Sequence, residues 1–348
     1  MSRKATNQIL QKAKQLKSDE FYTQLADIEN ELQYYKQHFK NKVVFCNCDD
    51  ARVSNFFKYF FAYFQELGLK KLISACYMEP EISSNSNKIS KGFYCEYEGK
   101  KDWQTTIDGL KFFKGDGDFR SEESIQLLKE ADVVVTNPPF SLFREFVAQL
   151  IEHSKKFLII GNINAITYKN IFTLIKNNKV WLGMHLGRGI SSFIVPRHYE
   201  LYGTETKIDS LGNRLISPNN CLWLTNLDYK KRHEILPLTK KYNKNKYELY
   251  DNFDGINVNR TTDIPLDYRG SMGVPITFLH KFNPKQFEII GFRKGNDGKD
   301  LSVNGKCPYF RVLIRHKKIT KGVFLIFSLT KGLQNIFYPK IKIIPNRF

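Results

Sequence analysis

Between residues 40 and 185, short apolar runs alternate with segments whose apolar residues recur at the spacing of a helix. A run of apolar residues bounded by turn signals predicts a buried strand, and apolar residues three and four positions apart predict an amphipathic helix. We expect strands at 42–46, 71–77, 132–136, 156–160 and 180–184, and helices at 54–67, 121–130, 142–153 and 170–177. Strands that alternate with helices are typical of an α/β fold with a doubly wound, mostly parallel sheet.

The pattern differs on either side of this region. Upstream, apolar spacing predicts a basic helix at 2–17 and a second helix at about 27–39, which Ser18 or Asp19 would cap. Downstream of residue 185, Gly, Pro, Asn and Asp are frequent and the apolar segments are short, as in a mixed region of strands and loops. The expected parts of the chain are 1–185, 186–320 and a basic, apolar tail at 321–348.

Composition narrows the class of protein. Apolar residues make up 42% of the 348 residues and aromatic residues 14%, which excludes a disordered or low-complexity chain. The 54 Lys and Arg outnumber the 35 Asp and Glu, which gives a net charge of +19. Because such a field attracts polyanions, and because each neutralised phosphate releases counterions, the charge favours a nucleic acid as the partner.

The cysteines and apolar segments predict a location. Six cysteines are too few for a disulfide framework, and their spacing does not match a zinc site, so we expect buried reduced thiols. The N-terminus lacks the apolar core of a secretory signal. The apolar stretch at 323–329 is too short to span a bilayer. We therefore expect a cytoplasmic protein with no membrane partner.

The strongest chemical signal is a tetrapeptide that follows the apolar run at 132–136. Asn137, Pro138, Pro139 and Phe140 come directly after this predicted buried strand. In open α/β sheets, ligands bind beyond the carboxyl ends of the strands, so the tetrapeptide lies where chemistry is expected. Two consecutive prolines fix φ and remove two N–H donors, which leaves a rigid turn with free carbonyl acceptors.

Such a turn can recognise an exocyclic amine. The side-chain oxygen of Asn137 and the carbonyl oxygen of Pro138 can each accept one N–H, which directs the nitrogen lone pair towards an electrophile. The same acceptors stabilise the positive charge that develops as the amine is alkylated. Phe140 offers a flat face on which a base can stack. The alternative is a turn that merely joins a strand to a helix.

Asn137-Pro138-Pro139-Phe140 resembles the catalytic motif of amino-group DNA methyltransferases, and the resemblance extends over about residues 1–316. The chain is similar to the EcoRI-type adenine-specific DNA methyltransferases in SDEFYTQ, GDGDFRS, VVTNPPFSLF, HLGRG, HYELYGTE, ISPNNCLWLTNLD, DIPLDY and NGKCPYFR. The resemblance implies a Rossmann-like methyltransferase domain at 1–185, with an N-terminal helical segment, and a DNA-recognition region at 186–320 that completes the sheet. It also implies methyl transfer from S-adenosylmethionine to N6 of adenine in duplex DNA, at GAATTC, within a restriction–modification pair.

The cofactor would lie against loops that follow the predicted strands. Tyr22 and Thr23 resemble part of the family's N-terminal cofactor-binding motif, although Gln24 stands where many relatives have Pro. The first strand is followed by Asn47, Cys48 and Asp49 instead of the usual glycines, and a loop without glycine cannot approach a ligand as closely. The candidate cofactor-binding residues are Tyr22, Thr23, Asn47, Asp49, Glu79, Asp116 and Phe119.

Each of these residues also has a structural interpretation. Asp49 would bind the α-amino group of the cofactor, or it would cap the following helix. Glu79 ends a strand where an acid typically binds ribose hydroxyls, or it is a solvated loop residue. Asp116 or Asp118 would accept from the cofactor's adenine amine, with Phe119 against the ring, or they form a turn and a helix cap. Direct transfer to nitrogen requires neither a metal ion nor a cysteine nucleophile.

The DNA side is less specific. Because a target adenine inside a duplex cannot reach the cofactor, the enzyme must flip it out. His185-Leu186-Gly187-Arg188-Gly189 could admit a phosphate, Phe193 could give the second face of a base sandwich, and the basic run 230–246 could contact phosphates or be a solvated face. The candidate DNA-binding residues are Arg188, Phe193, Lys230, Lys231, Arg232, Lys240 and Lys241.

Two other functions compete with DNA methylation. The same turn would serve a methyltransferase that acts on RNA or on a protein amide, although the size of the region after 185 favours a duplex. A catalytically silent DNA-binding protein would explain the glycine-less loop but not the intact Asn137-Pro138-Pro139-Phe140. We expect a monomer, without an obligate protein partner, whose functional counterpart is a restriction endonuclease.

Overall fold

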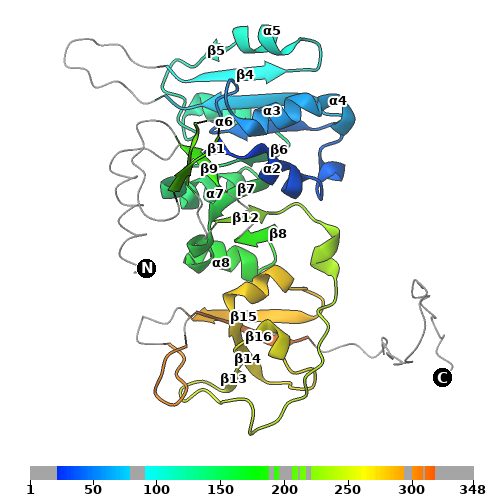
Figure 1. Cartoon of the computed structure of the whole chain (residues 1–348), viewed down its shortest axis with the longest axis vertical. Helices are drawn as coiled ribbons and strands as arrows, with labels where there is room; N and C mark the ends of the chain where they lie inside the picture. Colours follow the sequence, from blue (N-terminus) through cyan, green and yellow to red (C-terminus); the bar gives the residue numbers. More distant parts are fainter. Residues whose placement is uncertain are drawn as a thin grey trace, which may run out of the picture. The chain divides into compact units, whose positions relative to one another are not determined.

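Figure 1 shows the computed structural model of the chain. The structure describes residues 22–78, 91–187, 192–195, 206–210, 212–216, 221–293, 300–308 and 310–317. The helix expected at 2–17 and the tail at 321–348 lie outside these residues. Among the helices of the described ranges, none is long and apolar enough to cross a membrane.

The centre of the main sheet consists of parallel strands. β3 (Lys71–Cys76), β2 (Val43–Asn47), β6 (Val133–Thr136) and β7 (Lys156–Asn162) lie side by side in that order and all run in one direction. Their residues are almost all buried, as expected for parallel strands that are covered on both faces.

Strands that pair in antiparallel fashion extend the sheet on both sides. The full order is β5-β4-β3-β2-β6-β7-β12-β8. The added strands are β4 (Phe93–Tyr97), β5 (Lys111–Phe112), β12 (Cys221–Thr225) and β8 (Trp181–Gly187). Within this sheet β4 and β12 run against the direction of all the other strands. The prediction of an α/β fold with a mostly parallel sheet is confirmed.

Helices cover the main sheet on both faces (Figure 1). Alternate residues of β2 point to opposite sides: Val44 and Cys46 belong to one apolar cluster, and Val43 and Phe45 belong to the other. The first cluster contains side chains of α2 (Leu25–Leu32), α3 (Asn55–Ala62) and α4 (Phe64–Leu67), and the second contains side chains of α6 (Glu122–Glu130), α7 (Phe143–Glu152) and α8 (Lys169–Lys176).

The helices differ in detail from the prediction. The helix expected at 27–39 ends at Leu32, and a short 3-10 helix, η1 (Lys36–His38), follows. The hydroxyl of Tyr35 donates to buried Glu31, and its ring packs edge-on against Tyr229 at 5.5 Å between centroids. The contact with Tyr229 is a tertiary contact made by a residue beyond the end of α2. The helix expected at 54–67 is present, but it is interrupted between α3 and α4.

Some elements were not predicted. α5 (Trp103–Asp108) begins at Asp102, whose carboxylate accepts from the backbone N–H of Thr105 at 2.9 Å. The strand β12 was not predicted either, but it lies between β7 and β8, so that a segment after residue 185 completes the main sheet as expected. An apolar run between distant parts of the chain gives no local signal of the strands with which it pairs.

A second, small sheet joins the N-terminal segment to the region after residue 185. Its order is β1-β9-β11-β10, and every pair in it is antiparallel. The strands are β1 (Tyr22–Thr23), β9 (Phe193–Val195), β11 (Arg214–Ile216) and β10 (Thr206–Ile208). In this sheet Thr23 is directly opposite Phe193.

A third sheet follows a long connection in which 3-10 helix η4 (Lys230–His233) is the regular part. Its order is β13-β14-β16-β15, formed by β13 (Gly255–Asn257), β14 (Ser271–Pro275), β16 (Arg311–His316) and β15 (Phe287–Arg293). Phe292 of β15 packs against Phe172 of α8 at 5.1 Å, and residues of the third sheet belong to the same apolar cluster as α8. The expectation of short strands and loops after residue 185 is confirmed.

Candidate active site

The predicted catalytic turn lies at the carboxyl edge of the parallel strands. Thr136 is the last residue of β6, and Asn47 and Cys76 are the last residues of β2 and β3. Because β2, β3 and β6 are parallel neighbours, the loops that follow them meet at one edge of the sheet. The segments Asn47–Asp49 and Asn137–Phe140 are therefore close in space although they are distant in sequence.

The Asn-Pro-Pro-Phe turn is held by the elements on either side. Pro139 has an extended backbone (φ −56°, ψ 123°), and its carbonyl accepts from the N–H of Leu142 at 3.1 Å, which begins 3-10 helix η2 (Phe140–Leu142). Phe143, the first residue of α7, packs tightly against Gly161 of β7, where a Cβ atom would lie 2.5 Å from the phenyl ring. The turn is thus fixed between a buried strand and a buried helix start.

Thr136, which directly precedes the turn, binds the β2 loop. Its hydroxyl oxygen makes hydrogen bonds with the carbonyl oxygen of Asn47 and with Oδ2 of Asp49, the latter at 2.5 Å. All three groups are buried. The two loops that the sequence assigned to catalysis and to the cofactor are therefore joined by direct side-chain contacts.

Cys48 takes the place of a glycine in the β2 loop. Its φ is +80°, in the left-handed region that favours glycine. A side chain in this conformation costs roughly 1–2 kcal/mol. The loop therefore makes the tight turn that a glycine would allow, in spite of the departure from the family's glycine-rich pattern.

Asp49 faces inward from this loop. It is 9% exposed, Oδ1 accepts from the hydroxyl of Ser54 at 2.6 Å, and Oδ2 lies against Thr136. Burial raises the pKa of Asp49 to about 7, although the hydrogen bonds from Ser54 and Thr136 lower it. The structure thus gives Asp49 a role that was not predicted, because its oxygens bind two protein hydroxyls. The residue that caps α3 is Ser54.

Three buried polar atoms at this edge have no hydrogen-bond partner among the described residues. They are Oγ1 of Thr23, Nε2 of Gln24 and Nδ2 of Asn47. Thr23 is held in place because its carbonyl accepts from Nδ2 of Asn55 at 2.8 Å, at the start of α3. Because buried polar groups in proteins are almost always paired, a set of unpaired atoms in adjacent loops indicates a place for a polar ligand.

In the loop at 115–118, the two candidate acids, Asp116 and Asp118, differ in their hydrogen-bond partners. The carboxylate of Asp118 binds the guanidinium of Arg120 through two hydrogen bonds, at 2.6 and 2.9 Å, and this pairing lowers its pKa. Oδ1 of Asp116 accepts from the backbone N–H of Asp118 at 3.0 Å, and the carbonyl oxygen of Asp116 accepts from the N–H of Met78 at 2.8 Å. Gly117, with φ +81°, lies so close to Cys76 that a Cβ atom would be 2.7 Å from its carbonyl oxygen. Asp116 is thereby held beside the end of β3.

For three candidate cofactor-binding residues, the structure gives little evidence of contact with a cofactor. Phe119 is buried in the core, with its ring 5.1 Å from that of Phe146, so its contact with a cofactor stays a prediction. Glu79 lies outside the described residues, as does the side chain of Tyr22.

The two aromatic residues proposed for the base sandwich do meet. The rings of Phe140 and Phe193 are 6.3 Å apart between centroids at an interplanar angle of 71°. Phe193 is only 1% exposed. In this arrangement the two rings contact each other edge to face, so a base could enter between them only after one ring had moved.

The candidate DNA-binding cations fall into two groups. Lys230, Lys231, Lys240 and Lys241 are exposed, as a phosphate contact requires. Arg232 is buried: its guanidinium lies 3.6 Å from the centre of the Trp181 ring and pairs with Asp228 at 3.3 Å. The prediction for Arg232 is corrected accordingly, because it joins η4 to β8 and does not face solvent.

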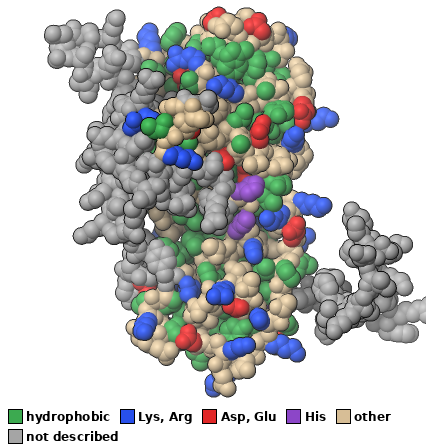
Figure 2. All heavy atoms as spheres, in the orientation of Figure 1, with side chains coloured by type: hydrophobic (Ala, Val, Ile, Leu, Met, Phe, Trp, Pro, Cys, Tyr) green, Lys and Arg blue, Asp and Glu red, His purple; other side chains and the backbone are tan. Residues whose placement is uncertain are grey.

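The distribution of charge on the surface does not locate the DNA-binding face. Figure 2 shows Lys and Arg side chains spread over the visible face, not gathered in one patch. Arg188 lies outside the described residues.

The sequence reasoning missed Thr136 and the conformation of Cys48. Thr136 is the one polar residue at the end of a run of valines, directly before the tetrapeptide, and this position was the signal that could have identified it. The left-handed backbone of Cys48 has no signal in the residue type. It follows from the loop's contacts with Ala75, whose carbonyl accepts from the N–H of Asp49 at 2.8 Å.

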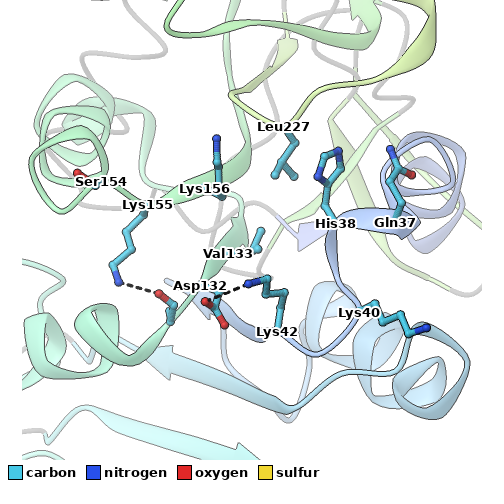
Figure 3. A pocket seen from close by; sticks show the side chains of 11 residues that line it. Gln37, His38, Lys40, Lys42, Asp132, Val133, Ser154, Lys155, Lys156 and Leu227 are labelled. Carbon is cyan, nitrogen blue, oxygen red and sulfur yellow. Dashed lines mark hydrogen bonds and ion pairs between the residues drawn. The ribbon is translucent and has the colours of Figure 1, made fainter.

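A hollow lies at the opposite edge of the sheet, at the amino ends of β2, β6 and β7 (Figure 3). Its volume is about 440 Å³. Figure 3 shows Lys42 pointing towards Asp132, and Lys155 directed at a backbone carbonyl at the end of α6. Because these charged groups serve as partners for one another and for the backbone, this hollow is distinct from the catalytic turn and lacks its chemistry.

Fold and site together define a class. Acceptors for an amine at the end of a central strand, beside a loop with unpaired polar atoms, are what an amino-group methyltransferase needs. The chain belongs to the family whose model is described as adenine-specific methyltransferase EcoRI, and that model matches residues 9–317. The expected resemblance is thus confirmed over nearly the whole chain.

Relatives from three organisms agree with this family. The chain is 66% identical over 326 residues to the type II methyltransferase M.EcoRI of Escherichia coli, covering 92% of this chain and 100% of that protein. It is 38% identical over 333 residues to the type II methyltransferase M.MgeORF184P of Mycoplasma genitalium, covering 88% and 98%. It is 36% identical over 327 residues to M.MpnI of Mycoplasma pneumoniae, again covering 88% and 98%. No solved structure matches the chain.

These similarities confirm the predicted activity. The chain is a site-specific, adenine-specific DNA methyltransferase of a restriction–modification system. Among the alternatives, the comparisons do not favour a silent DNA-binding protein or a methyltransferase that acts on RNA or on a protein amide.

Proposed function

We propose that the protein transfers a methyl group from S-adenosylmethionine to N6 of adenine in duplex GAATTC. The observation that carries this proposal is the contact between the Asn-Pro-Pro-Phe turn and a β2 loop with unpaired buried polar atoms. The mostly parallel sheet, with helices on both faces, supports a doubly wound, Rossmann-like methyltransferase domain. The site GAATTC rests on the similarity to M.EcoRI.

The residues at the carboxyl edge suit the proposed cofactor. Oγ1 of Thr23 and the amide nitrogens of Gln24 and Asn47 offer one acceptor and several donors to its polar groups. Asp116 would accept from its adenine amine, and Glu79 and Tyr22 remain proposed contacts. When bound, S-adenosylmethionine supplies a methyl group attached to a positively charged sulfur.

The chain's own groups prepare the acceptor amine. The side-chain oxygen of Asn137 and the carbonyl oxygen of Pro138 accept the two hydrogens of N6, which turns the nitrogen lone pair out of conjugation with the ring. Both oxygens also stabilise the positive charge that develops on N6 during transfer. Phe140 stacks on the flipped base, and Phe193, if its ring moves, closes the other face.

Residues 186–320 would form the DNA-recognition region. The exposed side chains of Lys230, Lys231, Lys240 and Lys241 would contact phosphates, and Arg188 remains a proposed DNA contact. We further propose that the enzyme acts as a monomer, and that a restriction endonuclease that cuts the same site is its functional counterpart.

Two measurements test the proposal. Calorimetry should detect binding of S-adenosylmethionine to the purified chain, and labelled methyl should appear on a duplex that contains GAATTC but not on a scrambled duplex. Label on both duplexes would refute the proposed site but keep the chemistry. The absence of both binding and label would refute methyl transfer itself.

A further inference from the structure

A continuous set of buried hydrogen bonds connects the start of α3 to the catalytic turn. Ser54 caps α3, because its hydroxyl oxygen accepts from the backbone N–H of Phe56 at 3.1 Å. The same hydroxyl donates to Oδ1 of Asp49 at 2.6 Å. Oδ2 of Asp49 lies 2.5 Å from the hydroxyl oxygen of Thr136, which also binds the carbonyl oxygen of Asn47. We call Ser54, Asp49 and Thr136 the buried link.

The positions of the hydrogens in the buried link follow from its acceptors. A carbonyl oxygen can only accept, and the hydroxyl of Thr136 lies within hydrogen-bond distance of both the carbonyl oxygen of Asn47 and Oδ2 of Asp49. Thr136 therefore shares its single hydrogen between these two acceptors. Burial raises the pKa of Asp49 to about 7, and the nearby charge of Asp50 acts in the same direction. Ser54 and Thr136 thus both donate to the buried carboxyl group of Asp49.

The buried link joins two loops that belong to different steps of the proposed reaction. Asn47 carries an unpaired amide nitrogen on the cofactor side. Thr136 is covalently adjacent to Asn137, the proposed acceptor for the target amine. Thr225 of β12, the other buried threonine in the described strands of the main sheet, lacks this arrangement: it donates to the carbonyl oxygen of Phe157 at 2.6 Å, within the ladder of the sheet.

We propose that Thr136 and Asp49 are positioning residues for methyl transfer, which hold the Asn137 turn in register with the cofactor loop. The inference rests on the proposed function and adds residues to which the turn itself gives no clue. Without the link, Asn137 and the β2 loop would still be present but would no longer be fixed relative to each other. A small displacement of an acceptor in an active site lowers the rate of reaction more than it lowers binding.

The test compares three substitutions at two buried threonines. Thr136→Val keeps the shape but removes the hydroxyl, Thr136→Ser keeps the hydroxyl, and Thr225→Val makes the same change in the same sheet away from the turn. We expect Thr136→Val to lower kcat on a GAATTC duplex by about ten- to hundredfold. Its affinity for S-adenosylhomocysteine in calorimetry should fall about fivefold, with DNA affinity unchanged. Thr136→Ser should restore kcat to within about threefold, and Thr225→Val should keep the normal kcat.

A second pair of variants covers the case in which Thr136→Val does not fold. Ser54→Ala removes the donor to the other oxygen of Asp49 and also removes a helix cap. Asp102→Ala removes the cap of α5, which has no contact with the link. Both should lower stability by a similar amount, but only Ser54→Ala should lower kcat and the affinity for S-adenosylhomocysteine.

The outcomes separate this inference from the proposed function. A kcat for Thr136→Val within about twofold of the wild type would overturn the inference, as would an equal loss for Thr225→Val. If the first variant does not fold, an equal effect of Ser54→Ala and Asp102→Ala on kcat would overturn it. A wild-type protein that neither binds the cofactor nor methylates DNA would contradict the proposed function instead.

Discussion

The two edges of the main sheet differ in how their polar groups are satisfied. At the amino edge, Lys42 pairs with Asp132 at 3.6 Å, and Lys155 donates to the carbonyl oxygens of Lys129 and Ala131 at 2.8 and 2.7 Å, at the end of α6. At the carboxyl edge, buried polar atoms of Thr23, Gln24 and Asn47 have no partner in the described chain.

The difference teaches that a hollow alone does not identify the site. The amino edge has a hollow of about 440 Å³, yet its charges already stabilise the fold, for the ammonium of Lys155 donates to carbonyl oxygens at the end of α6. The carboxyl edge keeps polar groups unpaired and a non-glycine residue, Cys48, in the left-handed conformation. Functional sites are where proteins tolerate such costs.

The largest expected effect concerns the proton on Asp49. Its folded pKa is raised to about 7 from an unfolded value near 3.8, so between these values the folded state keeps a proton that the unfolded state has lost. Stability conferred by this residue therefore falls as pH rises through that window, by up to about 4 kcal/mol. Urea unfolding of Asp49→Asn and of the wild type should be measured at pH 5 and at pH 7. From pH 5 to pH 7, the free energy of unfolding of the variant should rise by roughly 2–3 kcal/mol relative to that of the wild type. If the difference in free energy of unfolding between the two proteins were the same at both pH values, the Asp49 carboxylate would be solvated and not buried.

Cys48 gives the next largest effect. A β-branched residue is poorly compatible with a left-handed backbone, whereas glycine adopts it freely. We expect Cys48→Val to lower the free energy of unfolding by about 2 kcal/mol more than Cys48→Gly does. Chemical denaturation of both variants is the measurement. Equal stability of the two would mean that the loop does not require this conformation.

The unpaired atoms at the carboxyl edge predict a binding effect. Asn47→Ala should weaken S-adenosylmethionine about tenfold in calorimetry, because a buried donor to the ligand is lost. The matched control is Gln37→Ala, at the rim of the hollow on the amino edge, which should bind the cofactor as the wild type does. Equal losses in both variants would remove the distinction between the edges.

The smallest effect concerns the basic residues after residue 225. Lys240→Gln and Lys241→Gln should each weaken DNA a few-fold and lower the salt dependence of binding by about one unit. Arg232→Gln should instead lower stability, because its guanidinium packs on Trp181. A titration of DNA binding against salt, with thermal unfolding beside it, separates the two behaviours. If Arg232→Gln changed only the salt slope, the buried position would be contradicted.

Much of the fold could be predicted because its signals are local. The apolar runs at β2, β6 and β7 and the cap of α6 at Ser121 are visible in neighbouring residues. β12 could not be predicted as the strand between β7 and β8, because its place depends on pairing with residues far away in the chain. Just beyond the end of α2, the ring of Tyr35 likewise packs against Tyr229, a residue far away in the chain.

For the site, the sequence located the turn but not its support. Asn137 to Phe140 could be identified because two prolines after a buried strand are rare and have a direct chemical meaning. The hydroxyl of Thr136 and the burial of Arg232 are tertiary facts. A basic run predicts exposed cations in general, and it cannot tell which one of them turns inward.

The central claim is that the carboxyl edge performs the chemistry and the amino edge does not. The most direct test is single-turnover methyl transfer to a GAATTC duplex by Asn137→Ala and by Asp132→Asn, which keeps an acceptor for the N–H of Val43. We predict a loss of about a hundred- to thousandfold for Asn137→Ala and a normal rate for Asp132→Asn. A normal rate for Asn137→Ala, or an equal loss in both variants, would contradict the account.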